Sequence, residues 1–203
     1  EIKDKLFLYD FFYKIGLLKI IDIIFTKLKN FYLNTHFFVQ KKSLEKKGSK
    51  FGNNCFIDPT VRIDIQGNSR IIIGNNVKIL NDCWLITEDN DELIIGDNTF
   101  ISQNVVISGN VKIGNNVLVA GFVSIIDANH NYDDISKNIN EQGGNKLPIV
   151  IGNDVWIGTH SIILQGVNIG DHSIVGANST VTKNIEPYSI VAGAKADIIK
   201  RRI

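Results

Sequence analysis

His130 is the residue whose type and place in the sequence point most directly to chemistry. It lies with Asp127 and Asn129 in a stretch, residues 126–150, that interrupts a regular spacing of aliphatic residues. Histidine has an ordinary pKa of about 6.5, so an imidazole can take up a proton near neutral pH. Interruptions of a regular scaffold are where sites tend to lie. We therefore predict a general base at His130; the alternative is an exposed loop histidine without a catalytic role.

The other reactive side chains give no pattern typical of metal or thiol chemistry. The two cysteines, Cys55 and Cys83, form no C-x-x-C motif, so we expect inert thiols and no disulfide framework. A zinc site of the γ carbonic anhydrase kind would need three histidines, two of them close in sequence. The four histidines are too widely spaced for that, so we expect no metal: they are His36, His130, His160 and His172.

A six-residue repeat of aliphatic residues must position these groups. It runs from Ile95 to Ile125 and again from Ile151 to Val181, and two shorter groups precede it from Phe51 and Ile73. Repeats of this kind predict a parallel β-helix, in which each hexapeptide gives one short strand and one corner. Three hexapeptides close a coil, so residues 51–187 predict about six coils and a prism roughly 30 Å long.

The segments that flank the repeat predict a different structure. Residues 6–33 combine aromatic and aliphatic residues with scattered lysines, which favours one or two helices. Their apolar runs are shorter than the ~18 residues needed to span a membrane. We expect packing against the protein or a neighbouring subunit, or peripheral contact with the inner membrane surface. Residues 1–50 would form this helical segment and a solvated linker, 41–50, and residues 188–203 a strand and a short helix.

The amino-acid composition limits the possible functions of the protein and the cellular compartments in which it could act. Apolar residues make up 44% of the chain and charged residues 21%, as in ordinary globular proteins, and the net charge is +1. This balance argues against a nucleic-acid partner. The start of the sequence shows no signal-peptide pattern, and cysteine usage fits a reducing compartment. We therefore expect a cytoplasmic protein.

The repeats resemble those of the hexapeptide-repeat acyltransferases. The resemblance is strongest from Pro148 to Gly193 and in the sequence IIDANHNYDD, residues 125–134, and it is closest to the sugar O-acetyltransferases of the galactoside, maltose and colanic-acid types. It implies an all-β solenoid with a left-handed β-helix, acetyl-CoA as co-substrate, and a homotrimer with sites between subunits. The implied reaction is direct acetylation of a hydroxyl on a sugar or glycolipid during surface polysaccharide or lipopolysaccharide biosynthesis.

The residues alone leave other functions open. An N-acetyltransferase of a nucleotide-linked amino sugar would need a similar base, and an antibiotic acetyltransferase of the streptogramin or chloramphenicol type shares the histidine loop. A third class is a non-catalytic scaffold, because many solenoids only bind partners.

The resemblance also implies roles for single residues around the acceptor. His130 is the base, and Asp127, in a D-x-x-H setting, orients the imidazole or stabilises the imidazolium; otherwise it serves only the turns of the loop. Asn104 binds the acceptor hydroxyl, unless it is a corner asparagine of the repeat. Trp156 lines the site near the thioester. A wall beside the acceptor would be made by Tyr132, Asp133, Asp134, Glu141 and Gln142.

The same resemblance places coenzyme A along the last coils. Gly158 and Thr159 would offer backbone N–H groups to the thioester oxygen. Family members often read G-N-P-A-K after the final strand, and here Asp197 stands in place of the lysine, so Lys195 is expected to supply the missing charge. The remaining contacts would come from Ala177 through its backbone, from Thr182 and Lys183 to pantetheine or phosphates, and from Lys200, Arg201 and Arg202 to the nucleotide phosphates.

Overall fold

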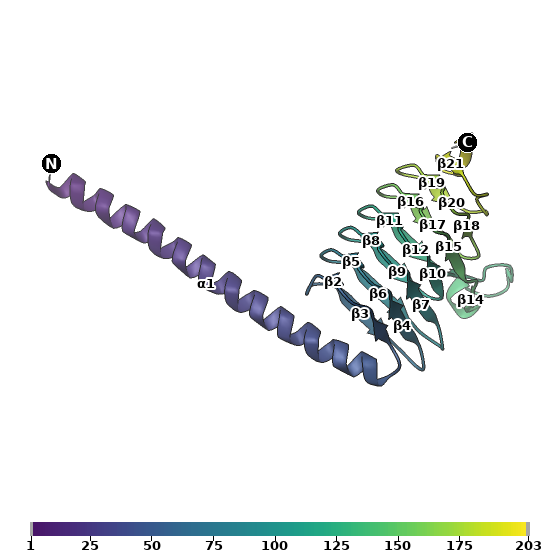
Figure 1. Cartoon of the computed structure of the whole chain (residues 1–203), viewed down its shortest axis with the longest axis horizontal. Coiled ribbons are helices and arrows are strands. Elements are labelled where there is room, and N and C mark those ends of the chain that lie inside the picture. Colours follow the sequence, from purple (N-terminus) through teal and green to yellow (C-terminus); the bar gives the residue numbers. More distant parts are fainter. Residues whose placement is uncertain (1, 202–203) are drawn as a thin grey trace. The chain divides into compact units, whose positions relative to one another are not determined.

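The chain winds into a three-sided parallel β-solenoid (Figure 1). The computed structural model describes residues 2–201; inside the helix the side chains of residues 2–12, 15, 17, 18, 30, 33, 34 and 36–38 are not described. The first sheet contains β1 (Lys50–Phe51), β4 (Arg70–Ile73), β7 (Glu92–Ile95), β10 (Val111–Ile113), β15 (Ile149–Ile151) and β18 (Asn168–Ile169). Each strand pairs in parallel with the strand one coil away.

The other two sides of the solenoid follow the same rule, except that the last pair of the second sheet is antiparallel. The second sheet contains β2 (Phe56–Ile57), β5 (Lys78–Ile79), β8 (Phe100–Ile101), β11 (Leu118–Val119), β16 (Trp156–Ile157), β19 (Ile174–Val175), β21 (Ser189–Ala192) and β22 (Asp197–Arg201). The third contains β3 (Arg62–Ile65), β6 (Trp84–Thr87), β9 (Val106–Ser108), β12 (Ser124–Ile126), β17 (Ile162–Ile163) and β20 (Thr180–Val181). This confirms the predicted solenoid of about six coils, consistent with a left-handed β-helix.

The repeat positions form the core, as the spacing predicted. Of the eighteen aliphatic or aromatic register positions between Phe51 and Val181, sixteen are buried, and only Phe51 and Ile57 in the first coil are partly exposed. Stacked residues such as Ile101, Val119 and Ile157 face one another in register. Burial of one such side chain contributes about 1.5–3 kcal/mol, so the column of aliphatic side chains is the main source of stability.

Steric and polar contacts explain why Gly-Asn and Gly-Asp recur at the corners of the solenoid. A Cβ at Gly74 would lie 2.8 Å from the backbone nitrogen of Asp97, so no side chain fits between adjacent coils there. The residue after the glycine supplies an oxygen to the preceding coil: Asn75 N donates to Asp97 Oδ1 at 2.7 Å, and Asp97 N donates to Asn115 Oδ1 at 2.7 Å. The corner side chains therefore hydrogen-bond one coil to the next.

The N-terminal segment is one continuous helix. α1 (Ile2–Lys46) has 45 residues, so helix replaces most of the linker expected at 41–50. Gly48, with φ of +91°, follows the helix end, and Ser49 N donates to Leu44 O at 3.1 Å. Along residues 2–201 no helix is both long and apolar enough to cross a bilayer. The peripheral membrane contact of residues 6–33 stays a prediction.

The C-terminal segment forms a hairpin and not the short helix that we expected. β21 and β22 pair antiparallel, with Ala192 opposite Asp197 and a bulge at Ile190 and Val191. All five residues of Asp197–Arg201 are exposed, and the strand lies at the edge of the second sheet. Arg202, expected near the nucleotide, lies outside the described residues.

Candidate active site

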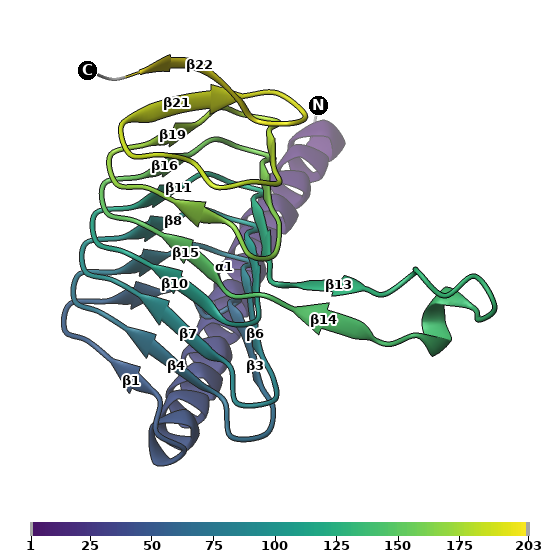
Figure 2. The same ribbon diagram turned by 90° about the vertical axis from the view of Figure 1, so that its right-hand side faces the viewer.

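The interruption of the repeat folds into a hairpin that projects from the side of the solenoid (Figure 2). It leaves after β12 and returns at β15, and its two strands, β13 (Ala128–His130) and β14 (Gly144–Lys146), pair antiparallel. A short 3₁₀ helix, η1 (Ile139–Glu141), lies in the outer part of the hairpin. The predicted loop is therefore an ordered arm.

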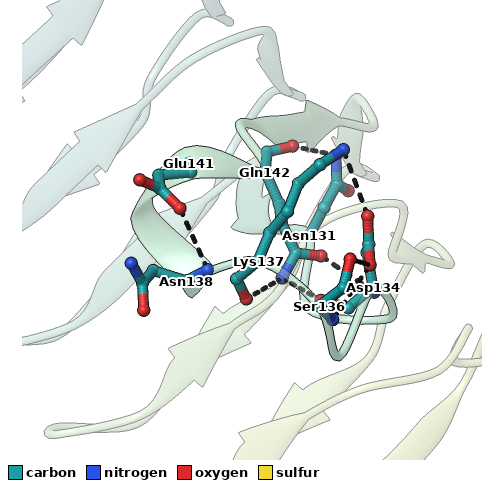
Figure 3. A network of polar contacts seen from close by, with 7 residues as sticks. All are labelled: Asn131, Asp134, Ser136, Lys137, Asn138, Glu141 and Gln142. Atoms are coloured by element: carbon teal, nitrogen blue, oxygen red, sulfur yellow. Dashed lines mark hydrogen bonds and ion pairs between the residues drawn. The ribbon is translucent and has the colours of Figure 1, made fainter.

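Polar side chains hold the tip of the hairpin together (Figure 3). The side-chain amide of Gln142 accepts from Asp134 N at 3.0 Å and donates to Asp134 O at 2.9 Å and to Lys137 O at 3.2 Å. The hydrogen bond from the Ser136 hydroxyl and the ion pair with Lys137 lower the pKa of Asp134. Glu141 Oε2 accepts from Asn138 N. Asp134, Glu141 and Gln142, which we expected in an acceptor wall, stabilise the arm.

His130 stands on the inner part of this arm, where two cavities meet. It faces Gly144 across the hairpin, its backbone N–H donates to Asn129 Oδ1 at 2.9 Å, and its ring is exposed. One cavity, of about 560 Å³, and another, of about 550 Å³, are both lined by His130. The residues that line the first include Ile126, Ala128, Asn129, Asn140, Asn145 and Lys146.

Asp127 has a structural contact in place of the expected orienting one. Its side chain is buried, and Oδ2 accepts a hydrogen bond of 2.7 Å from the backbone nitrogen of Asn110 in the preceding coil. The second oxygen, Oδ1, has no partner among the described atoms. Burial raises the pKa of Asp127, although the Asn110 hydrogen bond opposes the shift. The geometry supports the alternative in which Asp127 serves the root of the hairpin.

Asn104 occupies a corner whose backbone explains its residue type. Its φ is +57°, in the left-handed region that asparagine tolerates, and its backbone N–H donates to Asn81 O at 3.1 Å. Equivalent corners in other coils also have positive φ, at Asp82, Phe122, His160 and Asn178. The corner alone accounts for an asparagine here, and acceptor binding by Asn104 stays a prediction.

Trp156 lies on a different side of the solenoid from the base of the hairpin. It projects from β16 in the second sheet and is 51% exposed. In register with Leu118 and Phe100, it forms an apolar row, and this row lines a pocket of about 300 Å³. The walls of this pocket include Ser102, Ala120 and Gly121 but not His130.

The backbone amide of Gly158 does not have the role that we expected. Its N–H donates to Val175 O at 2.7 Å, so it links two coils and is not available to a thioester oxygen. A Cβ at Gly158 would lie 2.5 Å from Ala177 N, which explains the glycine. The Thr159 hydroxyl donates to Gly121 O at 2.7 Å, and Ala177 is exposed.

The expected phosphate-binding residues are gathered near the C-terminal hairpin. Lys183 pairs with Asp197 at 3.2 Å, so the aspartate that departs from the family pattern is bound to a lysine expected to contact pantetheine or phosphates. Arg201 hydrogen-bonds the Ser189 hydroxyl. Thr182, Lys195 and Lys200 are exposed. Their contacts with coenzyme A stay predictions.

One contact at the root of the hairpin was missed in the sequence. Lys146 Nζ lies 3.1 Å from Asp91 Oδ2, within a turn, residues 88–91, that reads Glu-Asp-Asn-Asp. The sequence signal was present, because this acidic turn fills one of the two four-residue insertions in the repeat. The pairing itself depends on how the coils stack, which sequence spacing alone does not give.

Comparison with known proteins agrees with the coil architecture. The family model described as bacterial transferase hexapeptide (six repeats) matches residues 93–127 and 148–183, the coils on either side of the hairpin. A hexapeptide-repeat-containing acetyltransferase from Vibrio cholerae, solved with acetyl coenzyme A, has a TM-score of 0.56 and 27% identity and is covered over 78% of its chain and 84% of this one.

Two curated relatives are galactoside O-acetyltransferases. The Escherichia coli K12 protein is 40% identical over 150 residues, which is 73% of this chain and 62% of that protein, so this chain spans about three fifths of that relative. The Lactococcus lactis protein is 31% identical over 81% of this chain and 68% of its own length. With such a relative matched over two thirds of its length and the repeat model falling on the buried coils, this chain belongs to the bacterial hexapeptide-repeat transferase family.

Proposed function

We propose that this chain transfers an acetyl group from acetyl-CoA to a hydroxyl of a sugar, with His130 as the general base. The observation that carries the proposal is the cavity of about 560 Å³ that His130 lines together with Asn129, Asn140 and Asn145. Amide groups both donate and accept hydrogen bonds, as sugar hydroxyls do, so this lining suits a carbohydrate better than an apolar acceptor.

The proton transfer follows from the chemistry of an alcohol. A protonated hydroxyl is a poor nucleophile, so the imidazole of His130 takes its proton as the oxygen–carbon bond to the acetyl group forms. The carbon–sulfur bond breaks, and the same proton then passes to the departing thiolate. The described linings of the two cavities at His130 contain neither Ser nor Cys. Direct transfer therefore fits the site better than a covalent relay.

The apolar row of Phe100, Leu118 and Trp156 fits the pantetheine arm of coenzyme A. Its pocket of about 300 Å³ is lined mainly by apolar side chains on a rigid sheet. Bound there, acetyl-CoA would supply the acetyl group as a thioester. Two of the relatives are named galactoside O-acetyltransferases, and a solved relative contains acetyl coenzyme A, which supports the choice of reaction and donor.

A homotrimer with sites between subunits accounts for the separation of these two features. His130 projects on the hairpin between the third and first sheets, whereas Trp156 lies on the second sheet. In a three-fold assembly the arm of one subunit would reach the apolar row of a neighbour. We propose that this trimer acts in the cytoplasm in surface polysaccharide or lipopolysaccharide assembly.

The experiment is thiol release from acetyl-CoA with a panel of acceptors: sugars, glycolipids, nucleotide-linked amino sugars, chloramphenicol and a streptogramin. Acceptor-dependent release with a sugar or glycolipid hydroxyl, and an ester in the product, is the expected result. Thiol release only with the amino sugars, or only with the antibiotics, would show that the acceptor belongs to that class and is not a sugar hydroxyl. Binding of acetyl-CoA without release for any acceptor would favour a non-catalytic scaffold.

A further inference from the structure

A charged contact fastens the hairpin to the body of the solenoid. Lys146 Nζ lies 3.1 Å from Asp91 Oδ2, 3.7 Å from Asp89 Oδ2 and 3.9 Å from Glu88 Oε2. These three carboxylates belong to the turn between β6 and β7, whereas Lys146 is the last residue of β14. We call the turn of residues 88–91 the acidic turn. The lysine therefore connects the return strand of the arm to a turn two coils away.

The contact differs from an ordinary surface ion pair. The Asp91 side chain is only 10% exposed, that of Lys146 is 34% exposed, and Asp91 Oδ2 also accepts from Glu88 N at 3.2 Å. Burial lowers the pKa of Lys146, but the hydrogen bond to Asp91 and the charges of Asp91, Glu88 and Asp127 raise it overall. Fully exposed pairs contribute little, but loss of the lysine would leave the buried carboxylate of Asp91 without this cation.

The same root carries a second attachment. Leu147 N donates to Asp127 O at 2.9 Å, which closes the base of the hairpin, and Asp127 Oδ2 accepts from Asn110 N in the coil below. Asp127 ties the outgoing strand to the coil next to it, and Lys146 ties the returning strand to the coil beyond. Two attachments at different heights restrict rotation of the arm about its base.

The register of the hairpin links this attachment to the site. Lys146 is directly opposite Ala128, and His130 is two residues farther along β13, opposite Gly144. Side chains alternate between the faces of a strand, so Lys146 and His130 project from the same face. Both line the cavity of about 560 Å³. A tilt of Lys146 therefore moves the wall of the cavity that contains the imidazole.

We propose that Lys146 is a positioning residue: through Asp91 it holds the hairpin at the angle at which His130 meets the acceptor. This inference rests on the proposed function of His130. The acidic turn, an insertion in the second coil, would then also serve to hold the hairpin in position. A misplacement of about 1 Å at a reacting group can lower a rate by about 100-fold. Greater freedom of the hairpin should therefore lower kcat.

The test compares K146M with K146R, with D91N, and with the double variant K146M/D91N. We expect K146M to lower kcat about tenfold or more with little change in the KM for acetyl-CoA, because the apolar row is on another sheet, and K146R to recover most of the loss. The double variant should be no slower than K146M, because both substitutions remove one contact. The matched control is R70Q, which removes the Arg70–Glu92 ion pair between β4 and β7 without touching the hairpin.

Hydrogen exchange separates a positioning role from a loss of fold. In K146M the amides of Asn131 and Leu147, which are hydrogen-bonded within the hairpin, should exchange faster, while that of Leu118, bonded to Val155 O, should be unchanged. A kcat for K146M equal to that of R70Q, or a uniform rise in exchange across the coils, would overturn the proposal.

The exchange experiment also separates this inference from the proposed function. If the wild-type protein acetylated no acceptor, the proposed function would fail, yet faster exchange limited to the hairpin of K146M would still establish the attachment. If the wild-type protein were active and the exchange of the hairpin amides in K146M were unchanged, the attachment would be wrong while the proposed function remained.

Discussion

His130 faces Gly144 across the two strands of the hairpin, so its direct cross-strand neighbour has no side chain. The glycine is also sterically required, because a Cβ at Gly144 would lie 2.7 Å from the backbone oxygen of Asn129. The cavity lined by His130, Gly144 and Lys146 follows from this pairing. The register of the arm thus helps to form the space that we propose for the acceptor.

Substitution of Gly144 by alanine should separate the two strands at His130. We expect G144A to lower kcat/KM for the acceptor about 100-fold, because a contact of 2.7 Å forces a backbone shift beside the base. Steady-state kinetics and thermal unfolding measure the effect. The matched control is G16A in α1, where a Cβ meets nothing within 4 Å. Equal kinetics for G144A and G16A would show that this register is unimportant.

Asp127 should make stability depend on pH in a defined direction. Its pKa in the folded protein is raised above 3.8, chiefly by burial, so the folded state holds the proton more tightly than the unfolded chain. The stabilisation from this group is complete below that value and is lost as pH rises through the folded-state pKa. D127N has no carboxyl group to titrate at this position, so the free energy of unfolding of D127N relative to wild type should increase as the pH rises from below 3.8 through the folded-state pKa of Asp127. Denaturant unfolding at several pH values measures this, and a constant or falling difference would contradict it.

The same variant distinguishes the two roles considered for Asp127. An asparagine keeps an oxygen that can accept from Asn110 N, so the root of the hairpin should survive, and we expect kcat to change less than about tenfold. A residue that stabilised the imidazolium would lose that function with its charge. A loss of kcat in D127N as large as in a variant without His130 would restore the catalytic role.

If the site lies between subunits, two inactive variants with different defects should regain activity when they form mixed trimers. H130A lacks the base, and W156A lacks the aromatic ring of the apolar row. When the two are unfolded together and refolded, mixed trimers contain some sites with both residues intact, so thiol release should exceed that of either parent treated alone. Light scattering checks that each parent has three times the mass of the chain. Activity no higher than the average of the parents would indicate a site within one subunit.

The sequence predicted the scaffold well because the repeat has one physical cause. Each coil after the first buries the same three positions, so the spacing of residues such as Ile101, Val119 and Ile157 determines the core without knowledge of distant contacts. The positions of the corner glycines could be predicted from the sequence equally well. The relation between corner side chains, such as Asn75 and Asp97, is local to adjacent coils and repeats along the chain.

The site was less predictable because it depends on contacts outside the repeat. The link from Lys146 to Asp91 joins residues 55 positions apart, and the hydrogen bond from Gly158 to Val175 uses an amide that sequence similarity suggested was free. At the C-terminus, the open edge of the second sheet favours strand pairing of Asp197–Arg201 over the helix expected from that segment. In the first two cases the deciding partner lies in another coil, and at the C-terminus it is the edge strand β21.

The role of His130 as the general base is tested most directly by the kcat of H130A for acetyl transfer to the best acceptor found. General base catalysis contributes about 100-fold to 10,000-fold, so we expect H130A to lose kcat within that range while its unfolding temperature and acetyl-CoA binding are retained. The control is H172N, which alters a histidine paired with Asp154 at a distant corner whose positive φ suits asparagine. A kcat for H130A equal to those of wild type and H172N would contradict the assignment of the base, and with it the account of the hairpin as the catalytic arm.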